Sequence, residues 1–293
     1  MSTVMGMRLG RYGIWTFDFE DQPAGLIRDS VQELEELGWP AIWIPESERR
    51  EALTHAGFLL AATERLVVVN GIAQIWSREP QWTHHGARLL AEAYPDRHLL
   101  GLGYGGGRRD TRPLRAMTGY LDALDAFPES GTPIRRLLAA YGPKMLELAR
   151  DRSAGAHTYH VTPEHTAQAR EILGEGPFLG VEHAVLFETD ATKAREIARG
   201  HLHTYLTSKY NVAKFRCLGY TEADIDGGRG SDRLVDDLVF WGDLDTVTAK
   251  LREHLDAGAD HVGIQVIGTK PGTSAMPHWR RLTEALLPAD VPA

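Results

Sequence analysis

The segment LVVVNGIAQIWSREP, residues 66–80, joins a buried strand to a polar loop. Its first four residues are apolar and favour β-structure, without the polar alternation of a strand that has one face in water. This pattern is typical of a parallel sheet covered by helices. Gly71 then allows the backbone to bend or bulge. The loop that follows presents an amide, an indole, a hydroxyl and a guanidinium, either as a shelf for a flat ligand or as ordinary loop decoration.

Apolar strands and amphipathic helices alternate along the whole chain, which is the expected pattern of βα units that form a parallel sheet. The predicted strands are Leu9–Trp15, Ala41–Ile44, Leu66–Ala73, His98–Gly103, Arg135–Ala140, Ala154–Thr158, one within Phe178–Thr189, and His261–Ile267. Eight such strands in fewer than 300 residues predict a closed (β/α)8 TIM barrel. We expect a single domain over residues 1–293, with its chemistry at the C-terminal ends of the strands.

The bulk composition is that of an ordinary globular chain, with 293 residues, 43% hydrophobic and 25% charged. A net charge of −8 argues against a nucleic-acid surface. There is no apolar run long enough to span a membrane and no signal-peptide pattern, so we expect a cytoplasmic protein without membrane contact. The single cysteine, Cys217, excludes an internal disulfide and a zinc cluster of several thiolates.

Gly101, Gly103 and Gly106 follow a predicted strand with the spacing G-x-G-x-x-G. A dinucleotide-binding turn normally opens its domain, whereas three βα units precede this one. The favoured interpretation is a rim loop that lets a planar ring or a phosphate approach the backbone. A second candidate is the segment AYGPK, residues 140–144, where a helix N-terminus and Lys144 would favour a phosphate. An ordinary strand-to-helix loop with an exposed lysine is the alternative interpretation of the same residues.

Glu46 and His157 are the acid–base candidates, because each stands at the end of a predicted strand. A capping or solvent-facing carboxylate and a structural histidine are the alternatives. His201 and His203 imitate a metal-binding H-x-H pair, but they belong to a predicted helix, where residues two apart point to different sides. No metal site is therefore predicted. Nothing in the sequence has the order of an acyl-transfer triad.

Taken together, these segments resemble the luciferase-like monooxygenase superfamily, particularly its flavin- or coenzyme F420-dependent oxidoreductases. The pieces that carry the resemblance are ELGWPAIWIPE, GIAQIWSREP, YPDRHLLGLGYGG, RPLRAMTGYLDALDA, LLAAYGPKMLELARDRSAGAH and WGDLDTVTAKLREHLDAGADHV. They cover nearly the whole chain in the family's order and spacing.

The resemblance implies that a flavin or deazaflavin ring lies across the barrel mouth. It implies a bulge in the third strand, with a non-prolyl cis peptide at Gly71–Ile72. The loops after strands five and six, matched to Ala140–Gly142 and Gly155–His157, would hold the cofactor phosphate, and Gly103–Gly105 would line the ring or its polyol chain. The residues thus assigned to cofactor binding are Gly71, Ile72, Gly103, Tyr104, Gly105, Ala140, Tyr141, Gly142, Lys144, Gly155, Ala156 and His157.

Family members that use F420 often carry an acid followed by His after strand two, and Glu in the glycine loop. This chain has Glu46 followed by Ser47, and Gly106 at the second position, which leaves the proton donor unassigned. The resemblance favours a homodimeric F420-dependent oxidoreductase of a small organic substrate, with Glu46 or His157 assisting proton transfer and Trp76 shaping the pocket. The alternatives are an FMN-dependent monooxygenase and a barrel that binds deazaflavin without turnover.

Overall fold

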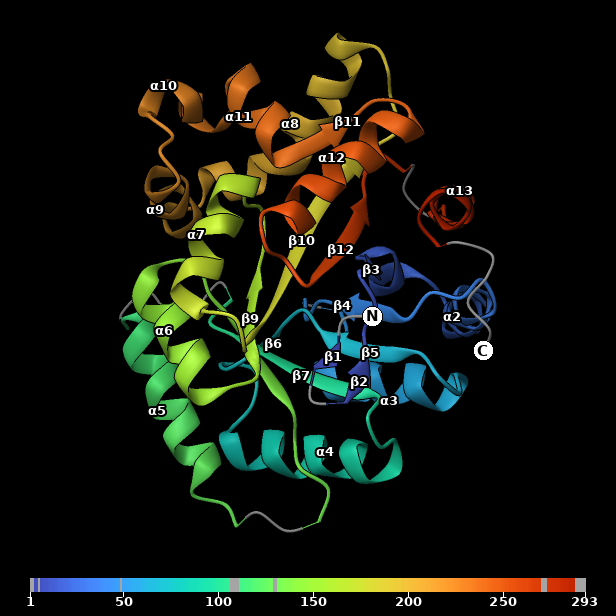
Figure 1. The fold of residues 1–293 in the computed structure, drawn as a ribbon, viewed down its shortest axis with the longest axis vertical. Coiled ribbons are helices and arrows are strands. Elements are labelled where there is room, and N and C mark those ends of the chain that lie inside the picture. Colours follow the sequence, from blue (N-terminus) through green and yellow to red (C-terminus); the bar gives the residue numbers. More distant parts are fainter. Residues whose placement is uncertain are drawn as a thin grey trace.

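A closed ring of eight parallel strands forms the centre of the molecule (Figure 1). The computed structural model describes residues 3–4, 6–47, 49–105, 111–128, 131–269 and 273–287. The ring order is β3 (Tyr12–Trp15), β4 (Ala41–Ile44), β5 (Val67–Asn70), β7 (His98–Gly103), β8 (Arg136–Ala139), β9 (Gly155–Thr158), β10 (Phe178–Leu186) and β12 (His261–Val266). Pairing of β12 with β3 and of β10 with β9 leaves no open edge in the ring. The predicted (β/α)8 barrel is confirmed.

Helices surround the barrel and cover the outer side of its strands, which are apolar on both faces. Nearly every strand residue is therefore buried. These helices are α2 (Ala24–Glu36), α3 (Ala52–Ala62), α4 (Pro80–Ala93), α5 (Pro113–Asp125), α6 (Pro143–Arg152), α7 (Pro163–Leu173), α12 (Leu244–Asp256) and α13 (Met276–Leu286). The short elements α1 (Asp18–Asp21), β1 (Thr3–Val4) and β2 (Met7–Arg8) complete the N-terminal part.

The third barrel strand contains a β-bulge between β5 and the two-residue strand β6 (Ala73–Gln74). Both pieces pair with β7: Val69 lies opposite Leu99, and Ala73 opposite Leu102. Four steps along the third strand (69 to 73) thus match three along β7 (99 to 102), so the third strand has one extra residue. The predicted bend after Asn70 is confirmed. The described residues contain no cis peptide bond, so the expectation of one at Gly71–Ile72 was wrong, and trans backbone makes the bulge.

Glycines on the neighbouring strand make room for this bulge. A Cβ atom on Gly101 would lie 1.9 Å from the Asn70 carbonyl oxygen, and one on Gly103 would lie 1.8 Å from Cδ1 of Ile72. The first two glycines of the G-x-G-x-x-G pattern therefore accommodate protein atoms. The third, Gly106, lies outside the described residues.

An insertion between β10 and α12 forms a helical layer above the barrel, at the top of Figure 1. It comprises α8 (Ala191–Thr207), α9 (Lys209–Cys217), α10 (Glu222–Ile225), the short 3-10 helix η1 (Asp226–Gly228), α11 (Asp232–Leu238) and β11 (Val239–Trp241). Its own apolar cluster includes Leu202, Phe215 and Leu234. Because β11 extends the sheet beside the end of β10, this layer is joined directly to the barrel.

Replacing Gly101 with Ala should destabilise the protein by about 2–3 kcal/mol, because the added methyl group collides with rigid backbone at Asn70. The matched control is Gly200→Ala in α8, where nothing lies within 4 Å of an added Cβ. Removing a helical glycine there should stabilise by about 0.5–1 kcal/mol. Equilibrium unfolding in urea measures both values, and equal stability of the two variants would contradict the packing described for the bulge.

Candidate active site at the barrel mouth

Three aromatic side chains from two strand ends, those of β3 and β9, meet at the C-terminal end of the barrel. Trp15 ends β3, and its ring centroid lies 4.9 Å from that of Phe17 and 5.1 Å from that of Tyr159. The Tyr159 hydroxyl donates to Gln265 Oε1 (3.1 Å) and bonds the hydroxyl of Tyr205 (2.8 Å). The indole nitrogen of Trp15 is buried and has no hydrogen-bond partner in the described part of the chain. The mouth therefore has an aromatic floor with an unused N–H donor.

The unused Trp15 N–H lies directly behind the bulge. A Cβ atom on Gly71 would lie 2.7 Å from Trp15 Nε1, so only glycine fits this position without displacing the indole. The bulge thus brings a bare stretch of backbone next to a free N–H donor, an arrangement suited to a flat ligand with carbonyl or ring-nitrogen acceptors.

Glu46 fixes the loop that follows the bulge. It is almost completely buried, and its carboxylate accepts from the backbone N–H of Gln74 (2.6 Å) and pairs with the Arg78 guanidinium. The Gln74 side chain donates to the Glu46 carbonyl (2.9 Å), and Arg78 also pairs with Glu51 (2.7 Å). Glu46, which was predicted to be an acid–base group, therefore has a structural role, because its bonds fix the position of this loop.

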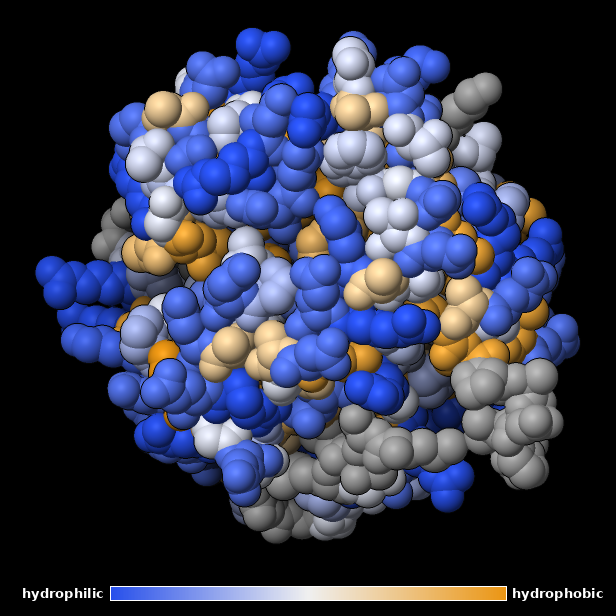
Figure 2. All heavy atoms as spheres, turned by 45° about the horizontal axis from the view of Figure 1, so that its top comes forward, coloured by the Kyte–Doolittle hydropathy of each residue, from blue (hydrophilic) through white to orange (hydrophobic). Residues whose placement is uncertain are grey.

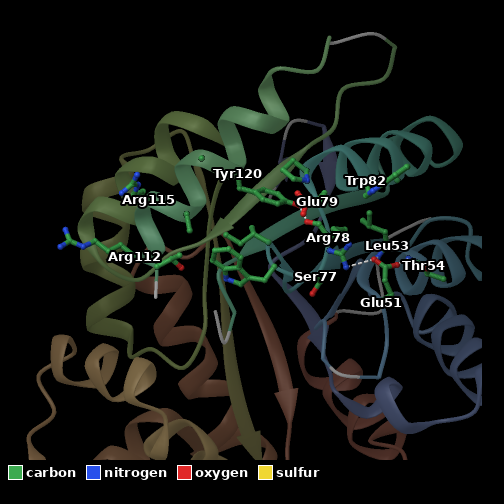
Figure 3. A pocket seen from close by; sticks show the side chains of 17 residues that line it. Glu51, Leu53, Thr54, Ser77, Arg78, Glu79, Trp82, Arg112, Arg115 and Tyr120 are labelled. Atoms are coloured by element: carbon green, nitrogen blue, oxygen red, sulfur yellow. Dashed lines mark hydrogen bonds and ion pairs between the residues drawn. The ribbon is translucent and has the colours of Figure 1, made fainter. Parts of the chain in front are cut away.

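A cleft of about 1330 Å³ opens beside this loop, between the starts of α3, α4 and α5. Figure 3 shows Arg112 and Arg115 on the α5 side, Trp82 on the opposite side, and Arg78 between them. Trp76 also lines the cleft and packs edge-on against Tyr104 at 5.3 Å. Trp76, which was predicted to shape the pocket, thus lines a cavity. This cavity lies beside the bulge and not over the barrel axis.

His157 lies inside the barrel, below the aromatic floor. Its ring stacks on Trp43 (4.5 Å between centroids), and Nδ1 donates to the Gly180 carbonyl (3.1 Å). Burial lowers the pKa of His157 to about 4, so its imidazole is neutral at neutral pH. The second ring nitrogen is buried with no hydrogen-bond partner among the described residues.

The other predicted cofactor residues are divided between the rim and the strands. Ala140, Tyr141 and Gly142 follow β8, Gly142 is the N-cap of α6, and Lys144 is exposed in its first turn. Gly155, Ala156 and His157 belong to β9 itself, so the expectation that they form the loop after strand six was wrong. That loop is Tyr159–His160. Gly103 and Tyr104 end or follow β7, and the left-handed Gly105 packs against Gln74.

The structure also brings together a buried polar cluster that the sequence analysis did not identify. Glu182, in the middle of β10, is fully buried, and Lys214 of α9 is 7% exposed. Burial raises the pKa of Glu182 to about 8, and burial lowers the pKa of Lys214 to about 7. A glutamate inside the otherwise mostly apolar strand FLGVEHAVL was the available sequence signal, but only the fold places Lys214 near it.

Residues 11–116 match the family model described as luciferase-like monooxygenase. A Mycobacterium tuberculosis protein, assigned by name to the coenzyme F420-dependent oxidoreductases, is 23% identical over 84% of this chain and 91% of its own length. The chain therefore has a luciferase-like sequence in its N-terminal part, as the resemblance implied.

Among solved structures, coenzyme F420-dependent tetrahydromethanopterin reductase from Methanopyrus kandleri is similar, with a TM-score of 0.71 and 17% identity. The match covers 94% of this chain and 98% of the reductase. An F420-dependent secondary alcohol dehydrogenase gives 0.70 and 13%, over 88% and 94% of the two chains. The FMN-bound oxygenating component of 3,6-diketocamphane monooxygenase from Pseudomonas putida gives 0.63 and 13%, over 94% and 96%. These likenesses show that the chain shares the (β/α)8 fold of these enzymes.

Two kinds of feature are absent from the described residues. No three His, Cys, Asp or Glu side chains there are grouped so that they could hold a metal ion. None of the helices in that part of the chain combines the length and the apolar composition that crossing a membrane requires.

Replacing Glu46 with Gln should destabilise the protein by about 3 kcal/mol, because it removes the buried carboxylate charge from the Arg78 guanidinium, which keeps only its pair with the more exposed Glu51. The matched control is Glu33→Gln, which breaks an ion pair with Arg280 at the surface, where the side chains are 33% and 54% exposed. That loss should stay below about 1 kcal/mol. Urea unfolding compares the two, and limited proteolysis should show faster cleavage near residues 74–79 in the first variant alone.

Proposed function

We propose that this protein is an F420-dependent oxidoreductase that acts on a small organic substrate. The observation that carries the proposal is the bulge at Gly71–Ile72, backed by the Trp15 N–H, which has no hydrogen-bond partner in the described part of the chain. Gly71 lets the Trp15 indole lie close against the bulged backbone, and the indole offers a hydrogen bond to a ring carbonyl or ring nitrogen. The residues present therefore fit a flat heterocycle.

The relatives support this choice of cofactor. The Mycobacterium tuberculosis relative and two of the similar structures are named for coenzyme F420. A bound deazaflavin would supply hydride chemistry, while the protein supplies orientation, exclusion of water and a proton source. We assign Gly71, Ile72 and Tyr104 to ring binding, the Ala140–Lys144 segment to the phosphate, and Trp76 to the substrate side.

An FMN-dependent monooxygenase is the second candidate, because an FMN-bound monooxygenase component has the same fold with a TM-score of 0.63. The bulge suits either ring. A barrel that holds deazaflavin without turnover is the third, and it is motivated by Ser47, which stands where a histidine is expected. Multiple turnovers with any substrate would eliminate the third candidate, and oxygen consumption with reduced FMN would favour the second.

We also propose a homodimer. Figure 2 shows one face of the molecule, with apolar side chains dispersed among polar ones. By contrast, α4 presents Trp82 and Leu89, which are 61% and 65% exposed and seven residues apart, on one face of the helix. Two large apolar side chains at this spacing form a stripe that a second copy could cover.

The cofactor assignment predicts that F420 binds the purified protein more tightly than FMN does. Fluorescence titration with each cofactor measures both affinities. Gly71→Ala should weaken F420 binding about tenfold, because its Cβ displaces the Trp15 indole, whereas Gly200→Ala should bind like the wild type. Tight binding of FMN without binding of F420 would overturn the assignment.

The dimer predicts that the double substitution Trp82→Ser and Leu89→Ser converts the protein to a monomer in light-scattering measurements. Both side chains are largely exposed, so the change should leave the unfolding midpoint of the single chain nearly unaltered. A matched change on another helix, Leu26→Ser on α2, removes a 56% exposed leucine and should not alter the mass. A wild-type protein that is monomeric at micromolar concentration would refute the dimer.

A further inference from the structure

Glu182 faces the inside of the barrel. It lies opposite Gly263 of β12, and aligned residues of neighbouring parallel strands point to the same side of a sheet. A Cβ on Gly263 would lie 3.3 Å from the Trp15 side chain, and one on Gly180, two residues before Glu182, would lie 2.9 Å from Trp43. Both tryptophans fill the barrel interior. Glu182 lies two residues after Gly180 on the same face of β10, so its carboxyl is nearer the barrel mouth than the Gly180 position is.

The carboxyl of Glu182 is only half satisfied. Its Oε2 accepts from the backbone N–H of His160 (3.1 Å), and Oε1 is buried with no hydrogen-bond partner among the described residues. His160 holds this position with a left-handed backbone (φ 51°), uncommon for a residue other than glycine. Both ring nitrogens of His160 are also buried without a hydrogen-bond partner in the described structure.

Helices α8 and α9 close this site from above. The titratable groups that face Glu182 are Tyr159 and His160 after β9, His201 and Tyr205 on α8, and Lys214 on α9. Lys214 Nζ donates to the Tyr159 carbonyl (2.8 Å) and lies 4.6 Å from the centre of the Tyr141 ring. Within the described residues no ion pair joins Lys214 to Glu182.

This arrangement favours a neutral carboxyl group. An ionised carboxylate without a paired cation is costly to bury, and the group responds by keeping its proton. The raised pKa of Glu182, about 8, expresses this cost of burial. Burial also lowers the pKa of Lys214 to about 7, so its ammonium can give up a proton near neutral pH.

We infer that Glu182 stores the proton that the barrel mouth delivers to a bound substrate, and that Lys214 restores it. The delivery of the proton to a substrate rests on the proposed function, whereas the storage of the proton on Glu182 does not.

The proton transfers balance without any added reagent. The O–H bond of Glu182 breaks, a bond forms between that proton and a substrate atom that has gained negative charge, and Glu182 becomes a carboxylate. The Lys214 ammonium then gives a proton to this carboxylate and becomes a neutral amine, which takes a proton from water. Since the two side chains are not in contact, the second transfer passes through a bridging group, for which the unpartnered His160 ring is placed.

The stored proton is tested in the protein without cofactor. Infrared spectroscopy should show the carbonyl stretch of a buried protonated carboxyl at pH 6, and this band should disappear as the pH rises through about 8. Glu182→Gln should abolish the band, and Glu171→Gln, at an exposed position, should not. Lys214→Met should move the titration to higher pH, because the lysine charge lowers the pKa of Glu182. A band absent at pH 6 would overturn the inference.

Unfolding free energy provides a second readout without cofactor. The folded protein keeps the Glu182 proton from the ordinary pKa of 4.5 up to about 8, whereas the unfolded chain releases it, so this group makes stability fall as pH rises over that window. Buried histidines such as His157 act in the opposite direction below pH 6.5. The comparison of Glu182→Gln with Glu171→Gln cancels their effect. The first variant should gain stability relative to the second as pH rises from 5 to 8, and a constant difference would contradict the stored proton.

The delivery step is tested with F420 and a substrate that is turned over. Glu182→Gln should lower kcat about 100-fold and remove the alkaline limb of its pH profile, while the affinity for F420 stays within twofold. Glu182→Asp should restore part of the rate. An unchanged kcat with an unchanged pH profile would overturn delivery by Glu182. Failure of F420 to bind at all would instead refute the proposed function, and the infrared result would still decide the stored proton.

Discussion

The extra residue in the third strand is the constraint on which the candidate site depends. A one-residue excess cannot fit into a closed parallel ring unless the neighbouring strand gives way, and β7 does so with glycine at positions 101 and 103. On the other side, Glu46 ties down the displaced loop through Gln74 and Arg78. The bend is thus held by close packing on one side and by a buried charge pair on the other, which keeps it rigid without a ligand.

The barrel interior combines heavy aromatic filling with polar groups that remain incompletely satisfied. Trp43 donates to His261 (2.9 Å) and stacks on His157, so the lower part of the interior is a packed hydrogen-bonded core. Buried atoms without a hydrogen-bond partner among the described residues occur at His157 in this lower part and, higher up, at Trp15 and Glu182. Buried polar atoms without partners oppose folding, and they concentrate where a protein binds or transforms a ligand. The unsatisfied groups near the mouth support a site at this end of the barrel.

The helical insertion gives the mouth a chemistry that the eight strands do not contain by themselves. It brings Tyr205 and Lys214 against Tyr159, and these contacts cover the carboxyl of Glu182. Removal of water raises the cost of charge there, which explains the opposite pKa shifts of the acid and the amine. In enzymes that transfer hydride, the cofactor supplies the hydride and the protein supplies the proton. A proton source that is shielded from solvent serves this purpose.

The sequence by itself determined the eight-strand barrel, because a parallel strand buried on both faces requires an uninterrupted apolar run that is visible in one dimension. It also located the bend at Gly71 and the strand-end position of Glu46. Tertiary structure alone decided that Gly101 and Gly103 accommodate the bulge and that Lys214 approaches Glu182. These are relations between residues distant in the chain, and no local pattern encodes a distance across the barrel.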